Sequence, residues 1–173
     1  DELVYNWCEV DRVLVITKKS IARLTWPEEI AKWDNFHHMS ISPIIGTPKQ
    51  RLKALSIKAD IYTINVENVE WLLDYFKELK QWPFQMLIVD ESSLMKKRRT
   101  KRTSRYHQVE VMSKVTKRVV LLTGTPTPNG YLDLFGQIYL LDHGERFSTS
   151  EEKFKVTYFV PNKVGPNHEV YSW

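Results

Sequence analysis

Five short apolar runs limit most strongly what this chain can fold into. They are rich in Val, Ile and Leu: VLVIT at 13–17, ISPII at 41–45, DIYTI at 60–64, MLIVD at 86–90 and RVVLLT at 118–123. A strand with one face in water alternates apolar and polar side chains, whereas a strand covered on both faces stays apolar. The runs do not alternate. We therefore predict five strands in a parallel sheet that is covered on both faces.

Segments with helical periodicity separate the apolar runs. In residues 65–80, apolar side chains recur every three or four positions, as on one buried stripe of a helix: Val69, Leu72, Leu73, Phe76 and Leu79. Residues 48–57 and 106–115 show weaker forms of this period, and Pro27 followed by two glutamates marks a further helix start. Strands that alternate with helices predict an α/β fold with right-handed connections.

The chain divides into a regular part and an irregular part. Residues 148–173 lack a clear period and contain two prolines and a glycine, so we predict an irregular extension there. Residues 1–147 hold the predicted strands and helices, and 173 residues suit one domain with its own core. Trp26, Trp33 and Trp71 fall on the helical stripes, and we expect them in that core rather than stacked on bases.

Composition narrows the cellular setting. Cys8 is the single cysteine, which excludes an intramolecular disulfide and a multi-cysteine zinc site, and predicts a reducing, cytoplasmic environment. The sequence has no run of about 18 apolar residues and no basic leader followed by an apolar stretch. We expect a protein that neither spans a membrane nor is secreted.

Polar residues gather where the predicted strands end. In parallel sheets, ligands bind outside the carboxyl ends of the strands. Asp90 and Glu91 directly follow the apolar Leu-Ile-Val of the fourth run. An unpaired buried charge costs several kcal/mol or shifts its pKa until it neutralises. These two carboxylates therefore either form a metal and phosphate site or mark a strand that emerges into a loop.

The positive charge is concentrated in one segment. Residues 96–105, KKRRTKRTSR, contain seven Lys or Arg in ten residues and no acid, within a chain of net charge +4. Such a block repels itself as a packed element, so it predicts an exposed loop. The loop is either simply solvated or binds nucleic-acid phosphates, through the candidate residues Arg98, Arg99, Lys101 and Arg102.

Several segments together resemble a known family. LLTGTPTPNGYLDLFGQIYLLD at 121–142, with IVDES about thirty residues earlier, resembles the first motor lobe of a superfamily-two helicase. VLVITKKSIARLTWPEEIAKW resembles motif Ia of its Swi/Snf-type branch, and DIYTINVENVEWL resembles motif Ib. PNGYLDLFGQIYLLDHGERF is most similar to small members encoded by bacteriophages, which act in a bacterial cytoplasm. The resemblance covers roughly residues 11–160 and implies a RecA-like parallel sheet flanked by helices.

The resemblance implies an ATP-dependent DNA helicase or translocase that uses ATP and Mg²⁺. Phosphoryl transfer needs a metal ion and an oriented water. By the resemblance, Asp90 would hold the magnesium ion through its water shell, and Glu91 would orient and activate the attacking water. Magnesium prefers oxygen ligands and keeps several waters, which suits one Asp at a strand end. Thr123, Gly124 and Thr125 would bind at the nucleotide and link it to the nucleic-acid groove.

The resemblance also assigns a nucleic-acid face, most simply for double-stranded DNA. Motif Ia would offer hydroxyl, ammonium and helix-start amide groups to backbone phosphates, from Thr17, Lys18, Lys19 and Ser20. Asn65 and Asn68 would do the same from motif Ib. Each of these residues taken singly is equally explained as a cap or a solvated side chain. Phosphate contacts carry no sequence information, so binding should be sequence-tolerant and salt-sensitive.

One family element is absent from these 173 residues. The phosphate-cradling loop has the pattern G-x-x-x-x-G-K-[ST], and none of the six glycines is followed by Lys and then Ser or Thr. We therefore expect an incomplete RecA-like first lobe, without its first strand and phosphate loop, from a longer motor that also has a second RecA-like lobe. Alone it should bind ATP poorly and hydrolyse essentially none.

Two other readings of the sequence remain. The first is a non-catalytic nucleic-acid-binding module with a RecA-like fold, and the upstream sequence of the parent would separate it from a motor. The second is an unrelated α/β hydrolase with Asp90 and Glu91 as an acid/base pair. That hydrolase would need a histidine or a nucleophile at another strand end, and no histidine falls there.

Overall fold

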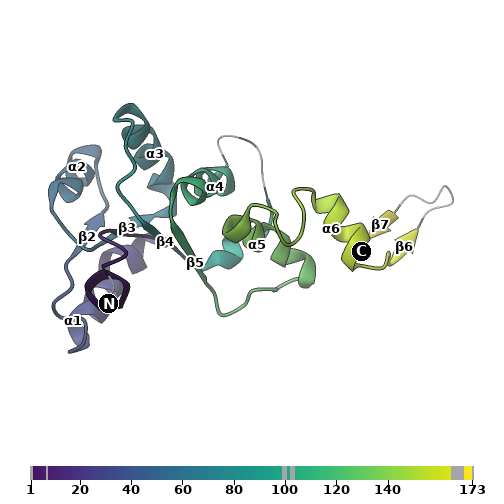
Figure 1. Ribbon diagram of the computed structural model, residues 1–173, viewed down its shortest axis with the longest axis horizontal. Helices are drawn as coiled ribbons and strands as arrows, with labels where there is room; N and C mark the ends of the chain where they lie inside the picture. Colours follow the sequence, from purple (N-terminus) through teal and green to yellow (C-terminus); the bar gives the residue numbers. More distant parts are fainter. Residues whose placement is uncertain (1, 7, 99–100, 102–103, 165–169, 173) are drawn as a thin grey trace.

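A five-stranded parallel sheet forms the body of the molecule. The computed structural model describes residues 2–6, 8–98, 101, 104–164 and 170–172. The strand order is β2-β3-β1-β4-β5 (Figure 1), with bounds β1 Val13–Thr17, β2 Ile41–Ile44, β3 Ile61–Asn65, β4 Met86–Asp90 and β5 Arg118–Leu122. Each predicted run forms a strand, and no boundary differs from the prediction by more than one residue. The predicted parallel sheet is confirmed.

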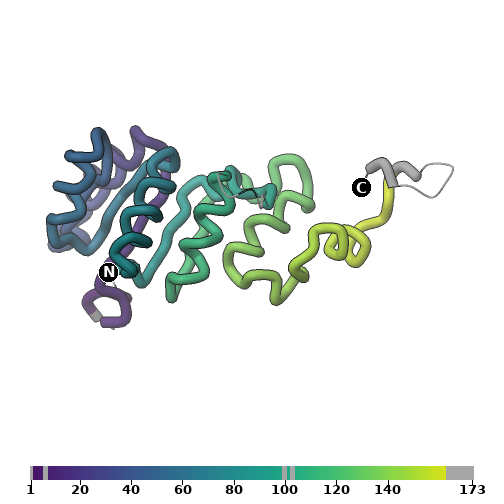
Figure 2. The backbone as a smooth tube through the Cα atoms, turned by 90° about the horizontal axis from the view of Figure 1, so that it is seen from above, coloured from purple at the N-terminus to yellow at the C-terminus, as the bar shows by residue number. Residues whose placement is uncertain are grey.

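Helices cover the two faces of this sheet unequally. Their bounds are α1 Trp26–Lys32, α2 Pro48–Ser56, α3 Val69–Glu78, α4 Arg105–Val115, α5 Leu134–Asp142 and α6 Glu151–Tyr158. Helices α2, α3 and α4 lie on one face, whereas α1 and the amino-terminal turn Glu2–Asn6 lie on the other (Figure 1). Seen from above, α5 and α6 extend beyond the β5 edge of the sheet and make the molecule elongated (Figure 2).

Each face of the sheet has its own apolar core. On the first face, Leu14, Ile64 and Leu87 of the strands pack with Leu72 of α3 and Met112 of α4. The second core is smaller, with Val13, Val15 and Ile61 packed among Trp26, Ile30, Phe36 and Met39. A cavity of about 490 Å³ remains on this second face. The helices therefore stabilise mainly the first face.

The depth of burial differs from strand to strand. All residues of β1 and β3 are buried, as predicted for strands covered on both faces. Strand β4 alternates between buried and half-buried residues, because Met86 and Ile88 face the thinly covered second side. Edge strand β5 is half-buried to exposed, so the prediction of full burial was wrong for β4 and β5.

The carboxyl-terminal stretch is more regular than predicted. Residues 151–158 form helix α6, where we predicted irregular structure. The Ser150 hydroxyl accepts a hydrogen bond from the Lys153 amide at 3.3 Å and caps the helix. Phe154 anchors it in a third cluster with Phe135 and Tyr139 of α5. Beyond it, β6 (Lys163–Val164) and β7 (Val170–Ser172) pair in an antiparallel two-stranded sheet.

Trp33 is a third point where the sequence prediction was wrong. Helix α1 ends at Lys32, and Trp33 follows it in an extended conformation with 53% of its surface exposed. Its indole N–H donates to Glu29 at 2.8 Å instead of entering the core. Trp26 and Trp71 do pack against the two cores, as predicted.

None of the described helices combines the length and the apolar character that crossing a membrane requires.

Candidate nucleotide and nucleic-acid site

The parallel register brings the ends of the strands together. Strand β1 lies between β3 and β4, so Thr17 pairs with Asn65 on one side and follows Ile16, the partner of Val89, on the other. Asp90 in turn pairs with Leu122, the residue before Thr123. The polar strand ends predicted from the sequence therefore lie along one edge of the sheet.

Glu91 stands at a sharp turn of the backbone. Its φ of 62° and ψ of 51° lie in the left-handed region, which a non-glycine residue seldom occupies. The side chain accepts hydrogen bonds at Oε1 from the hydroxyls of Ser93 at 2.7 Å and Thr123 at 3.2 Å. The Ser93 bond, the Thr123 bond and the charge of Lys18 together hold the pKa of Glu91 below its ordinary value, although slight desolvation opposes them. Glu91 is thus ionised at neutral pH.

Residues of β1 and α1 hold the carboxylate of Asp90. Its Oδ2 accepts a hydrogen bond from the Thr17 hydroxyl at 2.9 Å and another from the Trp26 indole N–H at 3.4 Å. Among the described residues, none donates to Oδ1. One carboxylate oxygen is therefore fixed by the protein while the other is available to a ligand.

Helix α5 braces the turn that follows these carboxylates. Ser92, in the 3-10 turn Ser92–Met95, donates to Gln137 Oε1 at 2.9 Å. The Gln137 amide N–H group donates in turn to the carbonyl of Pro126 at 2.6 Å. Gln137 is buried and so ties the turn after β4 to the loop after β5. Sequence reasoning missed Gln137, because a single glutamine on an apolar helix carries no distinctive signal.

A hydrogen bond within the loop after β5, to the side chain of Thr123, orders that loop. The Thr125 amide donates to Thr123 Oγ1 at 3.1 Å, while the Thr123 hydroxyl contacts Glu91. Gly124 and Thr125 are exposed. The structure thus brings Thr123 to the carboxylates and leaves the next two residues open to solvent.

The donor groups at this edge fit a magnesium ion bound with phosphate. No cluster of three His, Cys, Asp or Glu side chains occurs within the described ranges, so these residues build no all-protein cage. Magnesium instead takes one or two carboxylates, phosphate oxygens and waters. Asp90, with Oδ1 accessible and Oδ2 fixed, has the right chemistry for such a ligand. Zinc, by contrast, would favour nitrogen and sulfur ligands.

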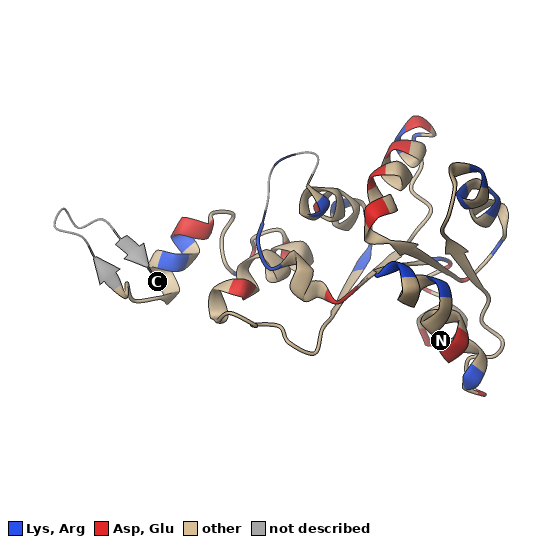
Figure 3. Cartoon of the chain, turned by 180° about the vertical axis from the view of Figure 1, so that it is seen from behind, with Lys and Arg blue, Asp and Glu red and all other residues tan. Residues whose placement is uncertain are grey.

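The turn after β1 presents several of the predicted phosphate contacts. Lys18, Lys19 and Ser20 are exposed there, and the charge of Lys18 acts on Glu91 at the end of β4. Figure 3 shows basic and acidic residues side by side in this part of the molecule. Thr17 is placed differently from the prediction, since it is buried and its hydroxyl is committed to Asp90. We therefore do not expect Thr17 to contact phosphate.

The two motif Ib asparagines bind each other. Asn68 donates to Asn65 Oδ1 at 2.6 Å, and Asn65 donates to Glu67 Oε2 at 2.7 Å. Arg51 donates to Asn68 Oδ1 at 2.6 Å, and Arg105 forms a 3.5 Å ion pair with Glu67. Asn65 is buried. The network fixes the side chains that follow β3. Of the two asparagines, only the half-buried Asn68 can also contact a ligand.

Arg98 is anchored rather than free. Its guanidinium lies 3.9 Å from the centre of the Tyr139 ring, donates to the Tyr139 hydroxyl at 3.0 Å and to the Thr149 carbonyl at 2.9 Å. It also forms a 3.5 Å ion pair with Glu110, whose side chain is 4% exposed. Because these contacts hold the guanidinium in place, we expect Arg98 to anchor the segment rather than to bind phosphate.

The rest of the basic segment is only partly described. Lys96 forms a 3.8 Å ion pair with Asp133, and Lys101 is exposed. Arg99 and Arg102, also predicted to bind phosphate, lie outside the described residues. Within the described part of this segment, Lys101 is therefore the predicted phosphate contact that remains exposed to solvent.

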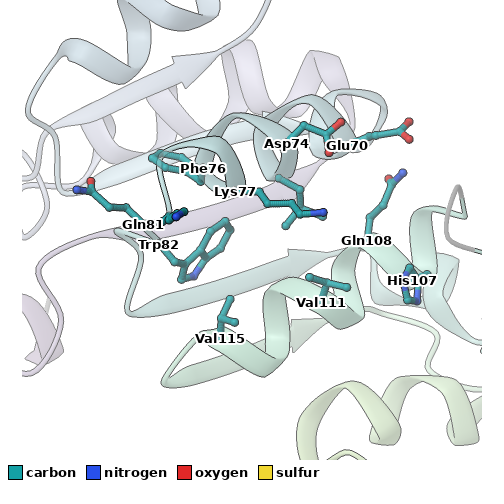
Figure 4. A pocket seen from close by; sticks show the side chains of 12 residues that line it. Glu70, Asp74, Phe76, Lys77, Gln81, Trp82, His107, Gln108, Val111 and Val115 are labelled. Carbon is teal, nitrogen blue, oxygen red and sulfur yellow. The ribbon is translucent and has the colours of Figure 1, made fainter.

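A separate groove lies between α3 and α4. Its volume is about 480 Å³, and Figure 4 shows Trp82, Val111 and Val115 among the side chains that line it, together with Asp74 and Lys77 of α3. None of its lining residues is a predicted site residue. The groove therefore has no part in the carboxylate site.

Comparisons with known proteins find related sequences over most of the chain. The sequence profile of the SNF2-related domain matches residues 5–169. Protein p41 of Acyrthosiphon pisum secondary endosymbiont phage 1 is 35% identical over 162 residues, which are 92% of this chain and 35% of the relative. The DNA annealing helicase and endonuclease ZRANB3 of Bos taurus is 33% identical over 155 residues, 88% of this chain and 14% of the relative.

A solved structure has the same RecA-like fold. The Sulfolobus solfataricus SWI2/SNF2 ATPase core in complex with double-stranded DNA superposes with a TM-score of 0.66 at 23% identity. The match covers 90% of this chain and 30% of the solved chain. The chain thus spans about a third of the length of its phage relative and of this ATPase core.

Proposed function

The chain belongs to the SNF2-related domain family, and from this premise we propose that it is the first RecA-like lobe of an ATP-dependent DNA translocase or helicase. Relatives bear the names of a helicase and of an ATPase core. The chain covers only part of each, so the activity is proposed for the complete parent protein. The phosphate loop and the second lobe would come from the rest of that parent.

The arrangement of Asp90 and Glu91 at one sheet edge is the observation that supports this proposal most directly. Glu91 is ionised, and hydroxyls from Ser93 and Thr123 fix its direction. A carboxylate in this state can accept a proton from an attacking water. Asp90 offers Oδ1 to a magnesium ion, which would neutralise developing charge on the phosphates.

Exposed lysines in two segments support DNA as the partner. Lys18 and Lys19 follow β1, and Lys101 lies in the basic segment. We propose that these residues, with Ser20, Asn68, Arg99 and Arg102, contact backbone phosphates of double-stranded DNA. Such contacts position the protein without reading sequence. In a phage-encoded member they would act in the bacterial cytoplasm.

The outer edge of β5 supports an incomplete lobe. No described strand pairs with it, and Leu122 at its end is 40% exposed. An open apolar edge strand can pair with strands of other molecules, so proteins normally cover such an edge. We propose that another strand of the parent, adjoining the phosphate loop, covers this edge.

Glu91→Gln in the complete parent tests the proposed chemistry. The amide keeps the shape of the side chain but cannot accept the proton, so turnover should fall about 10²–10⁴-fold. Binding of a fluorescent ATP analogue should stay within a few fold. Glu70→Gln, which changes an exposed acid on α3, serves as the matched control and should leave turnover unchanged. Wild-type hydrolysis by Glu91→Gln would remove Glu91 from the mechanism and favour a non-catalytic DNA-binding module.

A further inference from the structure

We propose that Thr17 and Trp26 are positioning residues for Asp90, which set the affinity of the site for its divalent cation. The inference rests on the proposed function, because it assigns Asp90 to the cation. It goes beyond that function by giving the motif Ia segment a role at the nucleotide site. Both residues act through Asp90 and need not touch the nucleotide.

The Thr17 hydroxyl has a single described acceptor, which is Asp90. Thr17 is 3% exposed, and its hydroxyl lies 2.9 Å from Asp90 Oδ2. Strands β1 and β4 are direct neighbours in the sheet, so the two residues are held at fixed spacing by the backbone ladder. This distance lies within the range of ordinary O–H···O hydrogen bonds.

Trp26 reaches the same oxygen from a different element. It begins helix α1, and its ring packs with Ile30 on the second core of the sheet. Its indole N–H lies 3.4 Å from Asp90 Oδ2. An indole N–H in a partly buried position normally needs an acceptor, and no other is present among the described residues. Trp26 therefore contributes both packing and a second donor.

Two donors on one oxygen orient the whole carboxylate. Rotation of Asp90 about its side-chain torsion would break both bonds, so Oδ1 is kept facing away from Thr17 and Trp26. Residues that hold a metal ligand in this way change metal affinity when they are replaced. Thr17 and Trp26 also bracket Lys18 and Lys19, so one segment carries the Asp90 donors and the proposed phosphate contacts.

Thr17→Val and Trp26→Phe in the complete parent chain test the proposal. Thr17→Val keeps the size of the side chain and removes its donor. Trp26→Phe removes the indole donor and part of the ring volume, a loss that the Trp82→Phe control below shares. The probe is Mn²⁺, whose sharp electron paramagnetic resonance signal in water disappears on binding, titrated in the presence of a non-hydrolysable ATP analogue. We expect the affinity for Mn²⁺ to fall about 10-fold or more in each variant. Thr17→Ser, which restores the hydroxyl, should recover wild-type affinity.

A second tryptophan–threonine pair provides the matched control. The Trp82 indole N–H donates to Thr116 Oγ1 at 2.9 Å, just before β5 begins and away from Asp90. Trp82→Phe and Thr116→Val remove the same kinds of donor and should leave Mn²⁺ affinity unchanged. Equal losses in these controls, or wild-type affinity in both Thr17→Val and Trp26→Phe, would overturn the proposal.

The readout separates this inference from the proposed function, because it needs no hydrolysis. A parent chain whose affinity for Mn²⁺ depends on Thr17 and Trp26, but which never hydrolyses ATP, would support the positioning role and reject the motor. Normal turnover with unchanged Mn²⁺ affinity in both variants would reject the positioning role alone. Failure of the wild-type parent to retain Mn²⁺ with the analogue would reject both.

Discussion

The Thr123 hydroxyl donates a 3.2 Å hydrogen bond to Glu91 and so joins the ends of the adjacent strands β4 and β5. With Ser93, it stabilises the ionised carboxylate and lowers its pKa. Removing the bond in Thr123→Val should raise this pKa, so that a higher pH is needed to ionise Glu91. The acid limb of the kcat/KM profile of the parent should therefore move to higher pH, and kcat should fall about 10-fold.

Thr123→Ser keeps the hydroxyl and is the control for this change. It should retain both the wild-type pH profile and most of the turnover. An acid limb that stays in place in Thr123→Val would mean that the Thr123 bond does not tune Glu91.

The basic segment should divide into anchoring and DNA-binding residues. We expect Arg99→Gln, Lys101→Gln and Arg102→Gln together to weaken DNA binding and to flatten its salt dependence. The slope of log K against log salt should become shallower by about 0.9 for each DNA phosphate that the variant no longer neutralises. Fluorescence anisotropy with a DNA duplex at several salt concentrations measures this slope.

Arg98→Gln should behave in the opposite way. Because its guanidinium binds Tyr139, Thr149 and Glu110, the substitution should lower thermal stability and leave the salt slope nearly unchanged. A slope that changes with Arg98 alone would restore this residue to the phosphate contacts.

Glu110 should make stability depend on pH. Burial raises its pKa, but the 2.6 Å contact with Lys114 and the ion pair with Arg98 outweigh burial and leave the pKa below its ordinary value. Folding thus favours the ionised form of Glu110. The contribution of this carboxylate to the free energy of unfolding is present above the ordinary pKa of a glutamate, and it is lost as the pH falls through the lowered pKa of the folded state. We expect Glu110→Gln to cost about 2 kcal/mol at pH 7.

Thermal unfolding of the parent at several pH values checks this. The difference between Glu110→Gln and wild type should shrink as the solution is acidified below the ordinary pKa of a glutamate. Equal differences at neutral and acidic pH would show that the charge of Glu110 is not responsible.

Gly136 should tolerate no side chain. A Cβ there would meet the carbonyl oxygens of Met95 at 2.5 Å and Lys96 at 2.6 Å, where α5 crosses the turn after Glu91. Gly136→Ala should therefore destabilise the protein by about 1–3 kcal/mol. Gly124→Ala is the control, because nothing lies within 4 Å of its Cβ position. Similar melting temperatures for the two variants would contradict this close approach.

The sheet could be predicted from the sequence because its signals are local. Unbroken apolar runs such as residues 13–17 specify buried parallel strands, and the register then places Thr17, Asn65 and Asp90 at one edge. Helix α6 had a local signal too, since Ser150 precedes two glutamates as in a capped helix start. We nevertheless predicted irregular structure there, because two prolines and a glycine follow further along the segment.

Contacts between residues far apart in the sequence could not be predicted from such local signals. The Trp26 bond to Asp90 joins residues 64 apart, and the stacking of Arg98 on Tyr139 joins residues 41 apart. No periodicity or spacing encodes such pairs. Lysine and arginine look alike in a basic run, so only packing distinguishes the anchored Arg98 from the exposed Lys101.

ATP hydrolysis by the complete parent, with and without double-stranded DNA, tests the central claim most directly. Glu91→Gln serves as the blank for contaminating hydrolysis. If Asp90 and Glu91 form the magnesium and water site of a DNA motor, DNA should strongly stimulate the wild-type rate and leave the blank at background. An absence of hydrolysis by the wild type in both conditions would contradict the motor and favour a lobe that only binds nucleic acid.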